Sequence, residues 1–306
     1  MAVNRSNPPV RGTQLLVEHM GSVVRRPLLV AIEIAWRWLF GIPFLLVCSR
    51  QVQAILTAFP LDSSGFNAID SQNPWVATVQ LAGVFSYYEP HVAVVLHWLL
   101  PMSAITWVVI SGLGRALVLA RLLPDAHPHH RFRPFTVMFL QAVWLGMLAV
   151  IFWGWLSAMH WVAATHIPGA GEPDLIGFAI WAIFLSLGFF TAWALVSWTA
   201  SVAPLLAILE GLSPIEALAR STQLGKPFTS KLAEINLVLG IVKLALLVVA
   251  MVFSAAPLPF SDELGSGAMH LVYAASAVFF LVSNDYFQVV RLEAFFEFWK
   301  VFRRPA

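Results

Sequence analysis

Long apolar stretches separated by short polar segments dominate the pattern of this 306-residue chain. An α-helix needs about 20 predominantly apolar residues to cross the hydrocarbon core of a bilayer. Six stretches meet that requirement, and they cover residues 27–48, 92–113, 135–158, 175–196, 237–256 and 271–290. The pattern therefore predicts an all-α integral membrane protein, built as a bundle of about six transmembrane helices.

The composition agrees with a bilayer as the solvent for most of the chain. Apolar residues make up 59% of the sequence and charged residues only 11%, whereas an ordinary soluble domain carries about 25% charged residues. A soluble fold of this size would need many more charged side chains to cover its surface. The single cysteine, Cys48, excludes an intrachain disulfide and a metal site built from cysteines.

Lysine and arginine gather on one side of the predicted membrane, whereas the opposite side carries only Arg50. Because cytoplasmic loops are enriched in these residues, we expect a cytoplasmic segment 1–26, a six-span domain 27–300 and a cytoplasmic tail 301–306. The segment 1–26 has no apolar core, so it is not expected to be a cleavable signal peptide. The cations on the cytoplasmic side are Arg5, Arg11, Arg25, Arg26, Arg115, Arg121, Arg131, Arg133, Arg220, Lys226, Lys231, Lys300, Arg303 and Arg304.

The longest loop, about 50–90, lies on the side opposite the cytoplasm. Asn73 and Pro74 open a run rich in aromatic and β-branched residues. This run predicts a helix on the membrane surface or a short re-entrant segment. We also expect kinks at Pro43, Pro101 and Pro204, because proline interrupts the hydrogen bonds of a helix.

The loop between the fourth and fifth stretches predicts a short amphipathic helix, about 214–224, on the inner membrane surface. Ser213 is a suitable N-cap, Pro214 favours the first helical position, and Glu216 completes a capping box. Glu216 and Arg220 form a favourable i,i+4 pair, and Gly225 ends the helix. The expected apolar stripe is Leu212, Ile215, Leu218 and Ala219. This helix is either a connector that orients its neighbouring spans or a coupling helix for a cytoplasmic partner.

This loop also carries a resemblance. An acidic residue, Glu210, ends the fourth span. A helix follows whose core reads Ala-Leu-x-Arg-Ser, at Ala217, Leu218, Arg220 and Ser221. It ends in a Leu-x-Lys sequence, at Leu224 and Lys226. The segment 285–293, near the end of the last span, is a second point of similarity, because it contains an aspartate and a tyrosine followed by charged residues. The last third of the chain thereby resembles the multi-span membrane domain of membrane-anchored glycerophosphoryl diester phosphodiesterases and of related stand-alone membrane proteins.

The resemblance implies a membrane domain and no phosphodiesterase activity. In that family the activity belongs to a separate soluble barrel, for which this chain has no room, and His130-Arg131 is followed by Phe132 where such barrels use glycine. The resemblance also implies a bacterial or archaeal protein. We therefore expect a multi-pass protein of a prokaryotic inner membrane.

Four ionisable residues fall inside predicted spans: Glu33, Arg37, Lys243 and Asp285. Charges within a bilayer are costly, and they usually pair or serve a function. Glu33 and Arg37 are four residues apart on one helix face and can pair. Counting along the helices places all four in the cytoplasmic half of the bilayer. This charged layer is either a neutral network that joins three spans or a polar path for a proton, an ion or a lipid headgroup. Arg291 and Glu293 lie at the inner boundary of the membrane, and their side chains are expected to extend to the interface.

Five histidines lie near the span ends opposite the cytoplasm, with several acidic residues on the same side: His91, His97, His160, His166 and His270. Imidazole and carboxylate groups together can bind a divalent metal. The spacing argues against this, because neighbouring histidines are six residues apart and fall on different helix faces. We therefore predict no metal and no cofactor. The inner histidines His127, His129 and His130 more plausibly form a basic patch near anionic lipid.

The sequence contains no phosphate-binding glycine loop, no nucleophile elbow and no paired-glutamate motif of an intramembrane protease. We therefore expect a non-enzymatic scaffold or accessory component. Its partners are the lipid bilayer and possible proteins at the cytoplasmic face, and no feature predicts binding to nucleic acid. The alternative is a transporter or flippase-like protein for a lipid or small amphiphile that uses the charged layer. An intramembrane enzyme acting on lipid is a third hypothesis, for which no nucleophile–base pair is visible.

Overall fold

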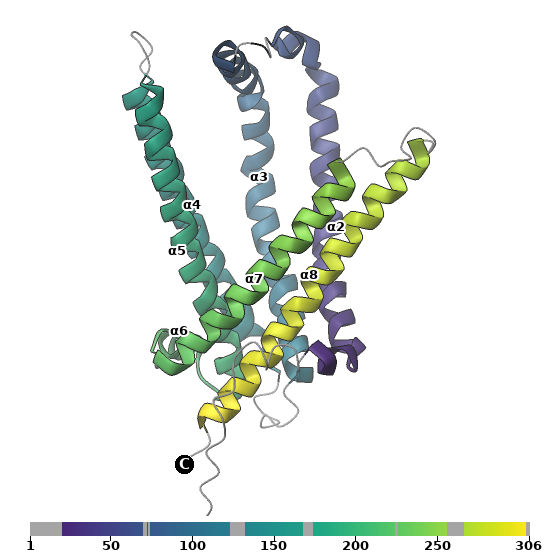
Figure 1. Ribbon diagram of the computed structural model, residues 1–306, viewed down its shortest axis with the longest axis vertical. Coiled ribbons are helices and arrows are strands. Elements are labelled where there is room, and N and C mark those ends of the chain that lie inside the picture. The colour runs from purple at the N-terminus through teal and green to yellow at the C-terminus, as the bar shows by residue number, and fades with distance from the viewer. Residues whose placement is uncertain are drawn as a thin grey trace, which may run out of the picture. The chain divides into compact units, whose positions relative to one another are not determined.

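The computed structural model describes residues 20–69, 72, 74–122, 132–167, 174–223, 226–255 and 266–303. These residues form long α-helices joined by short connections, and no β-strand occurs among them (Figure 1). The helices are α2 (Pro27–Ala58), α3 (Pro74–Leu122), α4 (Pro134–His166), α5 (Leu175–Leu209), α6 (Pro214–Thr222), α7 (Lys226–Ala255) and α8 (Ser266–Arg303). Two short 3-10 helices, η1 (Leu61–Ser64) and η2 (Phe66–Ala68), follow α2.

Five helices in the described part of the chain are long and apolar enough to cross a membrane, namely α2, α3, α4, α5 and α7. A bent pair, Ser201–Leu209 at the end of α5 and Pro214–Thr222, raises the number to six if it is one broken span. The sixth predicted stretch, 271–290, lies within α8, which has 38 residues but does not reach the same apolar standard over its described residues. The prediction of an all-α membrane protein is confirmed, with five to six such helices.

The chain divides into two compact units, which are described separately. Unit 1 comprises residues 1–35 and 112–306, and unit 2 comprises residues 36–111. Unit 2 therefore contains most of α2, the two 3-10 helices and the first part of α3. The described lysines and arginines that were predicted to lie on the cytoplasmic side all belong to unit 1.

Aromatic contacts join the two helices of unit 2. The ring of Trp107 lies 5.8 Å from that of Trp36 and 5.0 Å from that of Phe40. Near the loop between the helices, Tyr88 donates a hydrogen bond from its hydroxyl to the carbonyl of Phe59 at 2.9 Å. Buried aromatic pairs of this kind contribute about 0.5–1.5 kcal/mol each beyond the area they bury.

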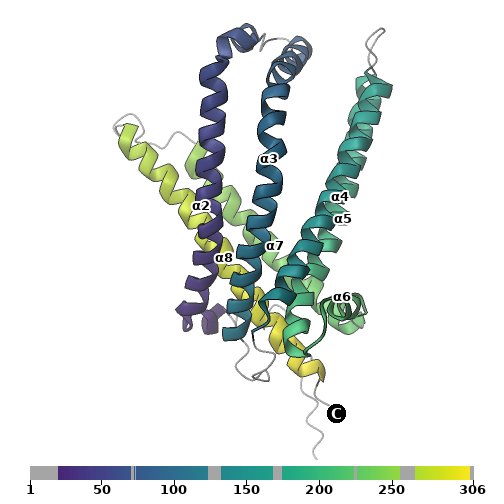
Figure 2. The same ribbon diagram turned by 180° about the vertical axis from the view of Figure 1, so that it is seen from behind.

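The predicted surface helix begins at Pro74, as expected, but it is continuous with the span that follows. α3 runs for 49 residues and contains both Pro90 and Pro101. Figures 1 and 2 show its first turns bending away from the direction of the rest of the helix. The helix predicted after Asn73 is therefore the first part of α3, which continues through Pro90 with a bend, and its position at the membrane surface or as a re-entrant segment stays a prediction.

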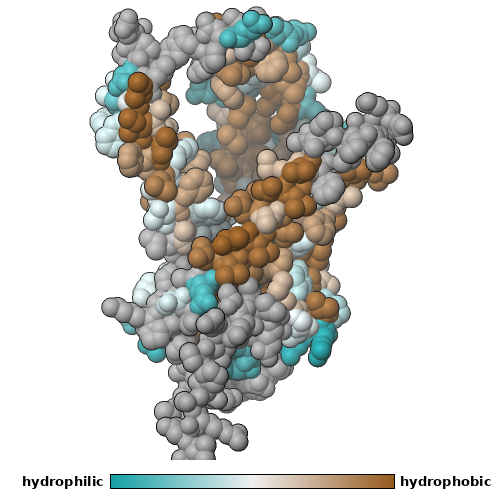
Figure 3. Space-filling model, viewed as in Figure 1, coloured by the Kyte–Doolittle hydropathy of each residue, from teal (hydrophilic) through white to brown (hydrophobic). Residues whose placement is uncertain are grey.

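Unit 1 is built from two helical hairpins, α4 with α5 and α7 with α8, whose members lie side by side in both views (Figures 1 and 2). Apolar side chains cover the outer surface of α7, as the brown atoms in Figure 3 show. Gly112 of α3 packs against α4 so closely that a Cβ atom there would lie 2.8 Å from the Cα of Met138. We call the end of unit 1 that holds α6, Arg26, Arg115 and Arg133 the basic end.

The protein core lies at the basic end. There α5 buries Val202, Ala203 and 205–208, and α8 buries most of residues 287–298. Away from this end the same helices expose large apolar side chains, such as Phe184 and Phe279. A membrane helix can leave such side chains exposed, because lipid tails are as apolar as they are.

Candidate functional site

The short helix of the inner loop has the cap that the sequence predicts. The hydroxyl of Ser213 accepts a hydrogen bond from the backbone N–H of Glu216 at 3.4 Å, and Glu216 Oε2 accepts one from the Ser213 N–H at 2.9 Å. The hydrogen bond from the Ser213 N–H, followed by the interaction of the carboxyl with the Ser213 side chain, holds the pKa of the Glu216 carboxyl below its ordinary value. The helix ends at Thr222 with Gln223 as its C-cap, two residues earlier than predicted; Leu224 and Gly225 lie outside the described residues.

The apolar stripe predicted for α6 is wrong in part. The buried face is formed by Ala217 and Ser221, with Leu218 half-buried, so it follows i, i+1 and i+4 spacing from Ala217. Ala217 packs with Leu140, Ala203 and Ala207, and Leu212 adds to the same cluster. Ile215, by contrast, is 72% exposed. The small side chains of Ala217 and Ser221 allow α6 to pack closely against α4 and α5.

Side chains from two other helices hold the turn between α5 and α6. Gly211 adopts a left-handed backbone conformation with φ of 67°, which glycine reaches without steric cost. Glu210 caps α5, and its Oε1 accepts a hydrogen bond from Trp299 Nε1 at 3.1 Å. Arg133 donates from Nη1 to the carbonyl of Leu212 at 2.9 Å. Both ends of the turn are thereby tied to α4 and α8, so the 120° bend into α6 is fixed.

The structure gives Glu33 a partner that sequence analysis had assigned to a loop. Glu33 is completely buried, and Arg115 Nη1 lies 3.5 Å from its Oε1. Asp285 is also buried, at 3% exposure. Arg37 belongs to unit 2, where its guanidinium lies 5.2 Å from the ring of Trp36. That the four predicted charges form one layer stays a prediction.

The expectation that Glu293 extends to the interface is wrong. Its side chain is 7% exposed, and Oε1 lies 3.9 Å from Arg26 Nη1. About two turns earlier, the hydroxyl of Tyr286 donates to the carbonyl of Met20 at 2.7 Å. α8 continues into the protein core where an aqueous interface was predicted, so Glu293 is covered by protein instead of reaching water.

Unit 1 contains a polar pocket of about 360 Å³ between α5, α7 and α8. Lys243 and Arg291 supply positive charge to its wall, and Ser197, Ser201 and Asn236 supply neutral polar groups. Arg291 Nη2 donates to the hydroxyl of Ser201 at 3.3 Å. The remaining lining residues are Trp193, Ala194, Leu239 and Gly240.

One wall of this pocket lies within a predicted span. Lys243 belongs to the stretch 237–256 and lies about 14 Å, at 1.5 Å per residue, from either end of the apolar segment Glu234–Val252. Of the predicted charged residues only Lys243 lines the pocket. Arg291 and the serines were missed, because in sequence they lie at span ends and carry no motif.

The histidines opposite the basic end do not gather into a metal site within the part of the chain that the structure describes. His166 Nδ1 lies 2.9 Å from Asp174 Oδ2, across the loop between α4 and α5. Asp174 also caps α5 by accepting from the Gly177 N–H. The hydrogen bond from Gly177, followed by that from His166, lowers the pKa of Asp174. This pair therefore closes the α4–α5 hairpin.

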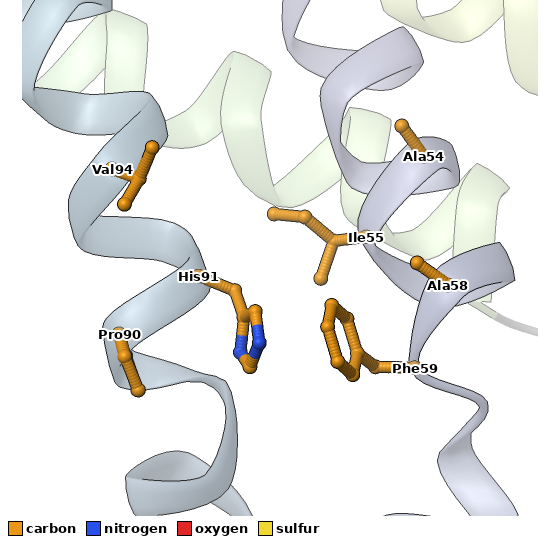
Figure 4. A pocket seen from close by; sticks show the side chains of 7 residues that line it. All are labelled: Ala54, Ile55, Ala58, Phe59, Pro90, His91 and Val94. Atoms are coloured by element: carbon orange, nitrogen blue, oxygen red, sulfur yellow. The ribbon is translucent and has the colours of Figure 1, made fainter.

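In unit 2, His91 lies in a different environment. Its ring faces the ring of Phe59 with centroids 3.7 Å apart, in a mostly apolar pocket of about 410 Å³ (Figure 4). The buried Nδ1 of His91 has no hydrogen-bond partner among the described residues. The contacts of this histidine are therefore with aromatic rings, those of Phe59 and Tyr87.

Comparison of the chain with family models, with curated proteins and with solved structures found no match. The resemblance to the membrane domain of glycerophosphoryl diester phosphodiesterases therefore stays a prediction.

Proposed function

We propose that this protein binds an anionic amphiphile within the membrane and transfers it, as a transporter or flippase-like protein. The observation that carries the proposal is the pocket between α5, α7 and α8, in which Lys243 and Arg291 share a wall with three neutral polar residues. Basic residues at membrane depth usually face a protein interior or a polar pathway. A phosphate or carboxylate headgroup matches both the charge and the hydrogen-bond donors of this pocket.

The position of the pocket fits an amphiphile better than a water-soluble anion. Apolar side chains from α5 and α7, among them Trp193 and Leu239, line the pocket beside the charges. An amphiphile satisfies both surfaces at once, because its headgroup pairs with the cations while its chains stay in lipid. A headgroup site at membrane depth is also what movement between leaflets requires.

The proposal includes an orientation. The basic end of unit 1 faces the cytoplasm, because cytoplasmic loops are enriched in lysine and arginine, and the membrane is the inner membrane of a prokaryote. α6 then lies at the cytoplasmic surface and exposes Ile215, Glu216 and Arg220 to it. The resemblance noted for the last third remains part of the proposal as a membrane domain without phosphodiesterase activity.

A flipping assay tests the proposal. Fluorescent phosphatidylglycerol is reconstituted with the protein in vesicles, and dithionite then destroys the fluorophores exposed outside. Lipid in the inner leaflet is protected from dithionite unless the protein moves it to the outer leaflet. With wild-type protein this protected fluorescence should therefore be lost, whereas with Lys243→Gln or Arg291→Gln it should remain. Ser197→Trp should have the same effect, because it fills the pocket and leaves both charges in place. Arg220→Gln, on the exposed face of α6, is the matched control.

A scaffold or accessory role is the second candidate, and the interactions at the basic end favour it. Contacts such as Glu33 with Arg115 and Trp299 with Glu210 join helices far apart in sequence. If wild-type protein does not move the lipid, and the pocket variants lower only the unfolding temperature, the pocket polar groups serve stability. The transport proposal would then be wrong, and the result would favour the scaffold or accessory role.

A further inference from the structure

We infer a second lipid site in unit 2, where the hairpin of α2 and α3 binds one acyl chain of an anionic phospholipid whose phosphate pairs with Arg50. The site is a pocket of about 360 Å³ between the two helices. It does not depend on the function proposed for the pocket in unit 1. Its walls come from residues 39–51 of α2 and 98–106 of α3.

The pocket is apolar along its length and polar at one end. Phe40, Phe44, Leu99 and Met102 line the apolar part, whereas Arg50 and Gln51 lie together at one end of the α2 wall. Ser103 and Thr106 also line the pocket, but each hydroxyl donates to a carbonyl of its own helix, at 2.9 Å to Leu100 and at 2.8 Å to Met102. The polar groups available to a ligand are therefore concentrated at the Arg50 end.

The length of the pocket matches one leaflet. From Leu39 to Arg50 is 11 residues along α2, or roughly 16 Å at 1.5 Å per residue. One leaflet contributes about half of the 30 Å hydrocarbon core, or about 15 Å. An acyl chain lying along α2 thus extends from the depth of Leu39 to the headgroup region at Arg50.

Charge complementarity identifies the headgroup as anionic. Arg50 is exposed, and it makes no ion pair or hydrogen bond with any residue that the structure describes. It follows the apolar stretch 27–48 by two residues, which is the depth of the lipid phosphates. Arg50 is also the lone basic residue on its predicted side of the membrane, where cations are otherwise disfavoured.

Photo-crosslinking in vesicles tests the site. The probes are phosphatidylglycerol and phosphatidylcholine, each with a diazirine in one acyl chain, and mass spectrometry locates the adducts. Phosphatidylglycerol should label 39–51 and 98–106 preferentially. Arg50→Gln should lower that labelling about tenfold, because it removes a charge-assisted hydrogen bond. Arg220→Gln should leave it unchanged.

A matched pair of serine variants separates occupancy of the pocket from contact with surrounding lipid. Ser103→Phe fills the pocket, whereas Ser49→Phe adds the same ring outside its lining. Each serine donates only to a carbonyl of its own helix, so each loses an equivalent hydrogen bond. We expect Ser103→Phe to abolish the preferential labelling and Ser49→Phe to preserve it. Equal labelling by the two lipids, equal effects of the two variants, or no labelling of these segments would each overturn the inference.

Discussion

Replacing Arg115 by alanine should destabilise unit 1 more than the loss of any exposed cation. Glu33 has no exposed surface, and Arg115 lies 3.5 Å from its carboxylate with 14% of its own side chain exposed. At an effective dielectric constant of about 20, Coulomb's law gives an attraction of about 5 kcal/mol at that distance. Desolvation of the two ions offsets much of this attraction in the intact pair.

The cost of breaking the pair is the measurable quantity. Removing one partner of a buried ion pair costs about 3–5 kcal/mol, because a charge is left in a low-dielectric site. Glu33 has other interactions as well, so we expect Arg115→Ala to fall near 3 kcal/mol. The double variant Glu33→Gln with Arg115→Ala should recover part of that loss, since no charge then remains to be buried.

Unfolding in mixed micelles with increasing sodium dodecyl sulfate, followed by tryptophan fluorescence, measures these free energies. Arg220→Ala is the control, because Arg220 is exposed on α6 and surface changes cost within about 0.5 kcal/mol. If Arg115→Ala costs no more than this control, the pair does not stabilise the fold. If the double variant is as unstable as Arg115→Ala alone, the loss does not come from a stranded charge.

Three further changes test other parts of unit 1. Gly112→Ala should cost about 1–3 kcal/mol in the same unfolding assay, because its Cβ would lie 2.8 Å from the Cα of Met138. Ser213→Ala should cost about 1 kcal/mol through loss of the α6 cap, and Ser213→Thr should retain most of the stability. Asp174→Asn should lower the unfolding temperature near neutral pH. The pKa of Asp174 in the folded state lies below the ordinary value of 3.8, so the ionised carboxylate stabilises the fold fully above pH 3.8. The difference in unfolding temperature between wild type and variant should therefore shrink as the pH falls below 3.8.

The pattern of apolar residues predicted which segments are helical. Each predicted stretch lies almost entirely within one helix, but the helices extend well beyond it, as α3 does from Pro74 to Leu122 around the stretch 92–113. The capping box at Ser213 and Glu216 was predicted correctly. Local sequence is sufficient for such features, because caps and spans depend on residues close together in the chain. The end of α6 was predicted less well, since Thr222 and Gln223 end it without a glycine.

The buried partners could not be predicted in the same way. Arg115 looks like a loop cation in sequence, since it follows the stretch 92–113, yet α3 continues to Leu122 and carries it into the protein. The same applies to Arg291 and Ser201, which are 90 residues apart and meet across a pocket wall. Such pairs are set by how the hairpins pack, and one sequence does not encode a readable signal for that packing.

The composition of α8 explains why this helix is not among the five that are apolar enough to cross a membrane. Over its first half, large apolar side chains such as Leu271 and Phe279 are exposed, as expected for a helix in lipid. Over its second half, Asp285, Gln288 and Glu293 are buried together with Phe295. These polar side chains lower the mean hydropathy of the segment, although protein covers them. The first half of α8 thus has the exposed apolar surface of a membrane helix, whereas its second half belongs to the core of unit 1, and hydropathy measures only the first of these features.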